Sequence, residues 1–172
     1  MHRYLDNGAD ISECSTYRYA LWRRLSMGER AVLFVGLNPS TADGDGDDPT
    51  IRRCLGYARR WGYDWLYMGN LYALRSTNPE QLDREADPFG PRNQDALKWL
   101  VGKADRVVAA WGARRLHSFP ATLGRWVLSR PDCRVFGWTK GGQPLHPLHL
   151  LSAIDEATLL VPEQLFLSSS DT

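Results

Sequence analysis

The sequence has few cysteines and no long apolar segment, and both absences limit what the protein can be. Cys14, Cys54 and Cys133 stand apart and form no Cys-x-x-Cys pair, so neither an iron–sulfur cluster nor a zinc knuckle is indicated. Scattered thiols are typical of a reducing cytoplasm. No apolar run approaches the roughly 20 residues that span a bilayer, and residues 1–14 lack a signal-peptide core. We therefore expect a cytoplasmic protein with no membrane partner, no metal and no cofactor.

Lysine is also scarce, since 18 of the 21 Lys and Arg residues are arginine. Guanidinium groups bind phosphate in a two-pronged manner and stack on bases, so this bias favours a nucleic acid or nucleotide partner. The codon usage of a high-GC genome explains the same bias equally well. The net charge of +1 argues neither for nor against a polyanionic partner. With 172 residues and no repeat or linker, residues 1–172 are expected to form a single domain.

The apolar run over residues 32–35 is followed by Gly36, Asn38 and Pro39. An unbroken apolar run of this length is typical of a strand buried on both faces, in a parallel sheet covered by helices. Gly36 and Pro39 predict a sharp turn at the carboxyl end of that strand. Open α/β sheets bind their ligands at this end, so we expect Asn38 to lie in a functional site.

Hydrophobic periodicity and capping signals predict alternating helices and strands along the chain. Residues 1–14 are expected to form an arm or a short edge element, and the long irregular connection 71–91 is typical of a functional loop or lid. We therefore expect a three-layer α/β/α sandwich with a central, mainly parallel four-stranded sheet. The predicted strands are 31–36, 65–68, 106–111 and 133–138, and the predicted helices are 15–27, 49–61, 92–104 and 121–130, with a short helix after residue 150.

Four short segments resemble, in order, motifs of the uracil-DNA glycosylase superfamily. Gly36–Ser40 resembles that fold's Gly-x-Asp/Asn-Pro turn, and Met68–Leu71 resembles the strand that ends in a base-reading Asn. Val107–Gly112 is similar to a central strand ending in Trp-Gly, and His146–Leu150 to the His-Pro-Ser-Pro-Leu motif, with Leu148 and His149 in place of Ser-Pro. The resemblance implies a uracil-DNA-glycosylase-like fold and a nucleobase pocket.

A closer resemblance is to a bacterial family of unassigned function within or beside that superfamily. The matching segments are Gly36–Asp43, Asp47–Cys54 and Trp61–Tyr63, with Asp87-Pro88 and His146–Leu148 later in the chain. This resemblance covers nearly the whole chain and implies a fold rather than an activity.

Two strand-end amides and a histidine are the main candidates for base recognition and catalysis. Asn38 can orient a water molecule or bond a base edge, and the donor and acceptor of Asn70 suit a base edge. His146 can stabilise negative charge on a departing base. Structural roles are the alternative for all three, as turn amides and a histidine satisfied within the fold. Asp43 is the next candidate base, and Trp111 is the candidate for base stacking.

The candidate phosphate-binding residues are Ser40, Thr41, Arg75 and Lys140, although Lys140 is equally well explained as a solvated loop lysine.

Four aspartates lie within residues 43–48 and raise the question of a metal site. An EF-hand would need Gly at position 48 and Glu at position 54, where this chain has Asp48 and Cys54, so that motif is excluded. The simpler interpretation is that Asp47 or Asp48 caps the helix that begins at Pro49.

The order of the resembling motifs and the positions of the strand ends together predict that Asn38, Asn70 and His146 converge on one pocket at the carboxyl ends of parallel strands. The predicted function is recognition of a nucleobase, with hydrolysis of an N-glycosidic bond in DNA as the reaction. Two alternatives stay open, namely an enzyme that acts on a free or modified nucleotide in a phage or defence setting, and a non-catalytic nucleic-acid-binding module. The sequence does not determine the oligomeric state.

Overall fold

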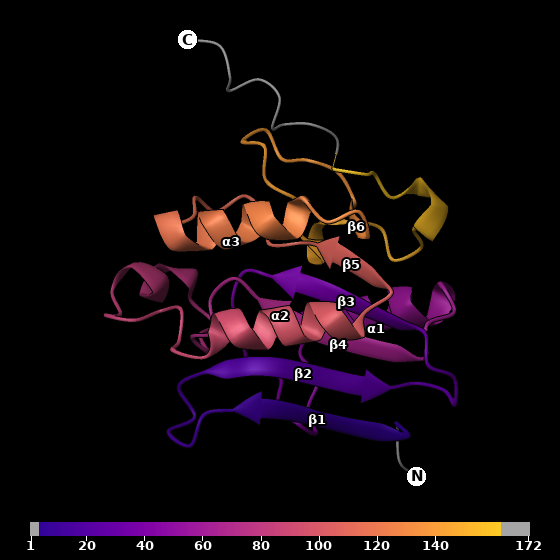
Figure 1. The fold of residues 1–172 in the computed structure, drawn as a ribbon, viewed down its shortest axis with the longest axis horizontal. Helices are drawn as coiled ribbons and strands as arrows, with labels where there is room; N and C mark the ends of the chain where they lie inside the picture. The colour runs from indigo at the N-terminus through magenta and orange to yellow at the C-terminus, as the bar shows by residue number, and fades with distance from the viewer. Residues whose placement is uncertain (1–3, 163–172) are drawn as a thin grey trace.

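A computed structural model of the chain describes residues 4–162 and shows an α/β fold on one six-stranded sheet (Figure 1). The strand order is β1-β2-β4-β3-β5-β6. β4, β3, β5 and β6 are parallel to one another, whereas β2 pairs antiparallel with β4, and β1 antiparallel with β2. The strands are β1 (Asp6–Ile11), β2 (Arg18–Arg24), β3 (Ala31–Gly36), β4 (Trp65–Asn70), β5 (Arg106–Ala109) and β6 (Cys133–Val135).

Three α-helices cover the two faces of the sheet. Buried side chains of α1 pack with one set of strand residues, and those of α2 and α3 pack with the set that points the other way. Figure 1 shows α2 and α3 in front of the sheet and α1 behind it. Within residues 4–162, no helix has the length and apolar character needed to cross a membrane. The helices are α1 (Pro49–Arg60), α2 (Asn93–Lys103) and α3 (Ser118–Leu128), with short 3-10 helices η1 (Pro79–Asp83), η2 (Pro147–His149) and η3 (Glu156–Thr158).

The central strand β3 is buried along its whole length, as its unbroken apolar sequence predicts. Val32 and Phe34 pack against α1, while Leu33 and Val35 pack against the cluster under α2 and α3. β3 pairs in parallel with β4 on one side and with β5 on the other. The carboxyl ends of these three strands therefore meet at one edge of the sheet, where a ligand site is expected.

Helix α1 begins at the predicted capping signal. The Asp48 carboxylate accepts a hydrogen bond from the backbone N–H of Ile51 at 2.9 Å, and Pro49 occupies the first helical turn. Such a cap stabilises a helix by about 1 kcal/mol. The helix ends at Arg60 with Trp61 as its C-cap, and Gly62 follows with a φ of +74°, which favours glycine. The predicted helix over 49–61 is confirmed.

The predicted helix over residues 15–27 is wrong, because residues 18–24 form strand β2. Most of β2 is buried, and the strand contributes side chains to both hydrophobic clusters, such as Ala20 to one and Leu21 to the other. Arg23 is fully buried and pairs with Asp47 at 3.0 Å. A buried arginine fits this strand because a loop distant in the sequence supplies its partners. The sequence of residues 15–27 gives no local sign of that loop.

The predicted four-stranded, uracil-DNA-glycosylase-like layout is not confirmed. The sequence predicts an arm or a short edge element over residues 1–14, and Asp6–Ile11 form the edge strand β1. Together with β2 it extends the four parallel strands into a mixed sheet of six. The α/β class and the parallel order of the other four strands agree with the prediction. The sequence did not predict that both segments join the sheet, because their antiparallel pairing depends on contacts across the sheet.

Candidate functional site

A cavity of about 340 Å³ lies at the carboxyl ends of β3 and β4. The predicted residues Asn38, Asn70 and His146 all line it, so the structure brings them together as expected. Ser40 and Trp111 line the same cavity. A volume in this range suits a small organic ligand.

Asn70 is the last residue of β4, and its side chain faces the cavity with no hydrogen-bond partner among residues 4–162. Its neighbour across the sheet is Gly36, where an added Cβ would lie only 2.8 Å from the Asn70 Oδ1 atom. Gly36 therefore leaves the space in which the amide sits. The backbone of this strand end is held by Asn93, which donates to the carbonyl oxygens of Asn70 and Leu71. Asn70 is only 2% exposed, but it lines the cavity. Its unused donor and acceptor are therefore available to a ligand bound there.

Asn38 is largely committed to the fold. Its side-chain nitrogen donates to the carbonyl oxygens of Pro39 at 3.0 Å, Leu74 at 3.3 Å and Ser76 at 3.0 Å. These bonds tie the turn after β3 to the segment after β4. The donor half of the Asn38 amide is thereby used, which is the structural alternative considered from the sequence, and its oxygen is the half that can contact a ligand or water.

His146 reaches the cavity from a segment far along the chain. Side chains of α1 and of the residue that follows it hold that segment, since Arg53, Tyr57 and Trp61 donate to backbone oxygens within residues 147–154. The Nδ1 atom of His146 accepts a hydrogen bond from the Leu148 backbone N–H at 3.2 Å, so the proton of the neutral ring is on Nε2.

Burial lowers the pKa of His146, and the nearby His149 lowers it further, against an opposing effect of Asp48. His146 is therefore a neutral hydrogen-bond donor near pH 7.

Asp43 does not line the cavity. It is exposed, and its Oδ1 atom accepts from the backbone N–H groups of Asp45 and Gly46 within its own loop. These bonds lower the pKa of Asp43. The carboxylate that does line the cavity is Asp48, which sequence analysis assigned only to capping α1.

Arg18 is the site residue that sequence analysis missed. It is 2% exposed and lines the cavity from the first position of β2. Its Nη1 atom donates to the carbonyl oxygen of Ala42 at 2.8 Å. The prediction of a helix over 15–27 gave no reason to place this arginine near Asn38. The first four residues of β2 are all buried, so the segment shows no alternation of buried and exposed residues that would have identified it as a strand.

A second cavity of about 410 Å³ adjoins the first one, and Ser40, Ser76 and Thr77 line both. The candidate phosphate-binding residues Thr41 and Arg75 also line this second cavity. Lys140 is exposed in the loop before Pro144 and is not among the residues that line either cavity. Three of the four candidate phosphate contacts are thus near the site, and Lys140 is not.

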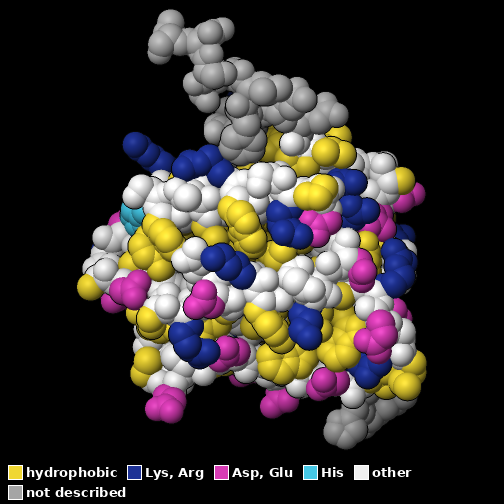
Figure 2. Space-filling view, in the orientation of Figure 1, with side chains coloured by type: hydrophobic (Ala, Val, Ile, Leu, Met, Phe, Trp, Pro, Cys, Tyr) yellow, Lys and Arg dark blue, Asp and Glu magenta, His cyan; other side chains and the backbone are white. Residues whose placement is uncertain are grey.

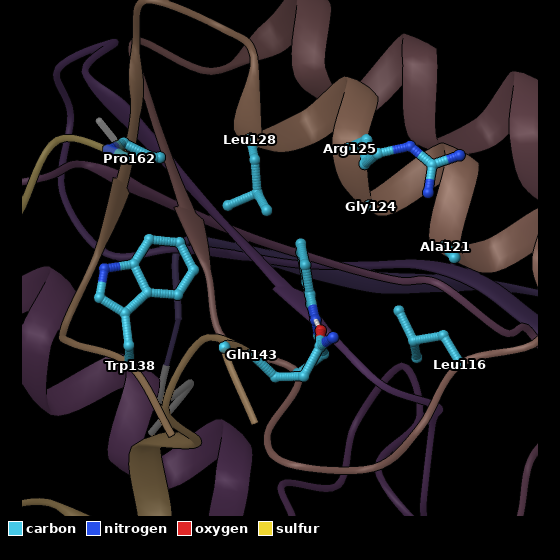
Figure 3. A pocket seen from close by; sticks show the side chains of 10 residues that line it. Leu116, Ala121, Gly124, Arg125, Leu128, Trp138, Gln143 and Pro162 are labelled. Carbon is cyan, nitrogen blue, oxygen red and sulfur yellow. Dashed lines mark hydrogen bonds between the residues drawn. The ribbon is translucent and has the colours of Figure 1, made fainter. Parts of the chain in front are cut away.

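Trp111 lies between the main cavity and a third, more apolar cavity of about 180 Å³ beneath α3. Figure 3 shows Leu116, Leu128 and Trp138 around this third cavity, and Gln143 projecting into it. The Trp111 indole N–H donates to the Gln143 side chain at 2.7 Å, and Trp111 is 2% exposed. The indole is therefore a fixed wall of the main cavity, with little surface for stacking.

The aspartates of residues 43–48 are occupied by separate partners. Asp43 binds its own loop, Asp45 accepts from Asn7, Asp47 pairs with Arg23, and Asp48 caps α1. Across the described part of the chain, no three His, Cys, Asp or Glu side chains are grouped so that they could hold a metal ion.

A family profile described as "Protein of unknown function (DUF1643)" matches residues 18–148. The chain belongs to this family. Searches of curated proteins and of solved structures gave no significant match. The expected membership of a family of unassigned function is thus confirmed, whereas nothing in the match links the chain to the uracil-DNA glycosylase superfamily.

The DUF1643 match begins at Arg18 and ends at Leu148, and these are also the first and last residues that line the main cavity. The family region therefore contains the entire site, while β1 and η3 lie outside it. Because the family has no assigned activity, the chemistry must be argued from the cavity itself.

Proposed function

We propose that the main cavity binds a nucleobase and that the protein hydrolyses an N-glycosidic bond, with DNA or a nucleotide as substrate. One observation carries this proposal: Asn70, with an unused amide, shares a cavity with a neutral histidine, His146, and a carboxylate, Asp48. The three groups are those that base recognition, leaving-group stabilisation and water activation require.

Asn70 is proposed to read the edge of the base. Its amide offers a donor and an acceptor side by side, which matches the paired acceptor and donor of a base edge. A base in a duplex would have to leave its stack to reach a buried amide. Because the amide has no partner within residues 4–162, the ligand would replace no existing protein hydrogen bond.

His146 is proposed to stabilise the departing base. When an N-glycosidic bond breaks, the electron pair stays with the base, and negative charge develops on its ring and oxygen atoms. A neutral imidazole with its proton on Nε2 can donate a hydrogen bond to that charge. The lowered pKa of His146 keeps the ring neutral near pH 7.

Asp48 is proposed to place the attacking water, together with the Asn38 side-chain oxygen. Both residues line the cavity, whereas Asp43 does not. The Asp48 Oδ1 atom caps α1, while Oδ2 has a longer contact of 3.4 Å to the Ala42 N–H and is the freer oxygen. A positioned general base contributes roughly 10²–10⁴-fold to the rate of such a reaction.

The test is single-turnover release of free base from uracil, thymine and modified-base substrates, offered as DNA and as nucleotides. Asp48→Asn keeps a capping oxygen but removes the charge, so it should slow release by about 10²-fold or more. Asp43→Asn is the matched control and should change the rate less than about threefold, because Asp43 lies outside the cavity. Equal effects of the two substitutions would contradict the assignment of Asp48.

An enzyme acting on a free nucleotide is the second candidate. On the face covered by α2 and α3, Lys and Arg side chains alternate with Asp and Glu and form no continuous basic surface among the described residues (Figure 2). A long polyanion needs many phosphate contacts, and its binding weakens steeply with salt. Salt-insensitive binding of a mononucleotide would favour this second candidate.

A non-catalytic binding module is the third candidate. It would replace the glycosylase proposal if the wild type released no base from any substrate of the panel and still bound those substrates.

A further inference from the structure

We propose that Arg18 and Arg75 together bind a phosphate group where the two adjoining cavities meet. The inference rests on the proposed function in one respect, because it makes that phosphate part of a nucleotide whose base occupies the main cavity. It assigns the ligand class as a phosphorylated nucleoside rather than a free base.

The backbone places the two arginines on the same side of one antiparallel ribbon. Tyr17 and Leu74 form an antiparallel bridge, and the backbone N–H groups of Arg18 and Arg75 bond the carbonyl oxygens of Ala73 and Thr16. Bridged residues point to the same side, and their neighbours point to the opposite side. Arg18 and Arg75 are neighbours of that bridge, one on each strand. Their side chains therefore emerge together on the face opposite to Tyr17 and Leu74.

Arg18 carries a buried guanidinium with few partners. It makes one hydrogen bond, to Ala42, and its Nε atom is buried without a partner among residues 4–162. It forms no ion pair with any described residue. Asp48 and Asp43 attract it from a distance, whereas Arg75 and Arg23 repel it. Burial lowers the pKa of Arg18 to about 10. Buried charges are costly unless they are paired and hydrogen-bonded, so this arginine lacks an anion.

Arg75, which lines the second cavity, also has an incompletely paired guanidinium group. It is half-buried, it donates to the carbonyl oxygen of Ser15 at 3.2 Å, and its Nε atom is also buried without a described partner. The hydroxyl groups of Ser40 and Thr77 lie along both cavities and make no hydrogen bond within the described residues. Two incompletely paired guanidinium groups and two unused hydroxyls thus surround one junction.

Phosphate is the anion that best matches these two guanidinium groups and two hydroxyl groups. Its oxygens accept paired hydrogen bonds from guanidinium forks, and its charge of roughly −1.5 to −2 offsets two neighbouring positive charges. A carboxylate carries less charge and fewer acceptor oxygens. The mutual repulsion of Arg18 and Arg75 is a cost in the free protein that a bound phosphate would remove.

The experiment compares the binding of a nucleoside and of its 5′-monophosphate to the intact chain by calorimetry at constant ionic strength. Wild type should bind the monophosphate at least about tenfold more tightly, because charged hydrogen bonds to phosphate are strong. Arg18→Lys keeps the charge and loses the fork, and Arg75→Met loses both. Each should reduce the preference to less than about threefold. Arg60→Met is the control, because Arg60 is exposed at the far end of α1, and it should keep the full preference.

Equal binding of the nucleoside and the monophosphate by wild type would overturn the inference, as would an unchanged preference in Arg18→Lys and Arg75→Met proteins that keep the wild-type circular dichroism spectrum. If nucleosides bind through Asn70 without any preference for phosphate, the proposed function stands and this inference fails. If inorganic phosphate binds through Arg18 and Arg75 but no nucleoside does, the phosphate site stands and the proposed function fails.

A further binding measurement distinguishes the phosphate of a free nucleotide from a phosphate within a nucleic-acid polymer. A short oligonucleotide without terminal phosphates presents only phosphodiester groups. Binding that is tighter than for the mononucleotide and equally sensitive to Arg18→Lys would assign the site to a polymer, and weaker binding would assign it to a free nucleotide.

Discussion

At the scale of single residues, substitution of Asn70 tests whether its unpartnered amide contacts a ligand or stabilises the fold. Asn70→Ala removes an amide that makes no hydrogen bond within residues 4–162, so thermal stability should not fall. Ligand binding should weaken by roughly 1–3 kcal/mol, because a base edge loses its partner. Gly36→Ala should weaken binding in the same way, because the new methyl group would displace the amide. Calorimetry and thermal melts measure both effects, and a loss of stability without a loss of binding would show that Asn70 is structural.

His146 tests whether the cavity is catalytic. His146→Asn keeps an acceptor for the Leu148 N–H and loses the Nε2 donor, so the η2 turn should survive while turnover falls by about 10²-fold. Ligand affinity should change much less, because the donor acts on charge that develops only in the transition state. Single-turnover rates and equilibrium binding measure the two effects separately. A parallel loss of affinity and rate would mean that His146 binds the ground state.

At the scale of elements, the η2 turn should make stability depend on pH. The pKa of His146 is lowered by burial and by His149, so between that lowered value and about 6.5 the unfolded chain binds a proton that the folded chain does not. The free energy of unfolding should therefore decrease as the pH falls through this window and level off below it. Urea unfolding of wild type and His146→Asn at several pH values tests this expectation, and the variant should show the smaller decrease. Identical pH profiles would contradict it.

Strand β2 and the loop over 43–47 depend on each other through Arg23. This buried guanidinium pairs with Asp47 and donates to the backbone carbonyl oxygens of Asp43 and Gly46. Arg23→Met should destabilise the protein by about 3–5 kcal/mol, because it leaves the buried Asp47 carboxylate without that partner. Arg24→Met is the matched control, since Arg24 pairs with the exposed Glu29 and should cost no more than about 1 kcal/mol. Urea midpoints measure both, and similar losses would contradict the role given to Arg23.

At the scale of the whole molecule, two buried thiols report on the two faces of the sheet. Cys54 lies in the cluster beneath α1 and Cys133 in the cluster beneath α2 and α3. Burial raises the pKa of both, that of Cys133 to about 12. Cys14 is exposed, and hydrogen bonds with Ser12 and Thr16 lower its pKa to about 7. The three thiols should therefore differ sharply in reactivity.

Iodoacetamide should modify Cys14 alone in the folded protein at pH 7.5, and Cys54 and Cys133 should react only on unfolding. If the two faces unfold as one unit, both buried thiols should become reactive at the same urea concentration. Mass spectrometry of the alkylated protein gives the two midpoints. Ser12→Ala serves as a control that should slow only the reaction of Cys14, and separated midpoints for Cys54 and Cys133 would show that the two clusters unfold independently.

The sequence by itself determined the elements whose signals are local. The apolar run before Gly36 is enough to specify a buried parallel strand, and Asp48-Pro49 is enough to begin α1, because burial pattern and capping act over a few residues. Strand ends predicted the positions of Asn38 and Asn70, and the order of the resembling motifs added His146. All three residues line one cavity.

Contacts between distant parts of the chain determined the features that no local sequence pattern specifies, namely strand β2 and the position of Arg18. Residues 18–24 form a strand because buried Arg23 finds its partners in a loop some twenty residues away, and this pairing outweighs the local preference for a helix. The same strand brings Arg18 into the cavity, which Asp48 also lines and Asp43 does not. A charged side chain can be buried only where distant groups compensate it, so its position depends on the completed fold rather than on its neighbours in the chain.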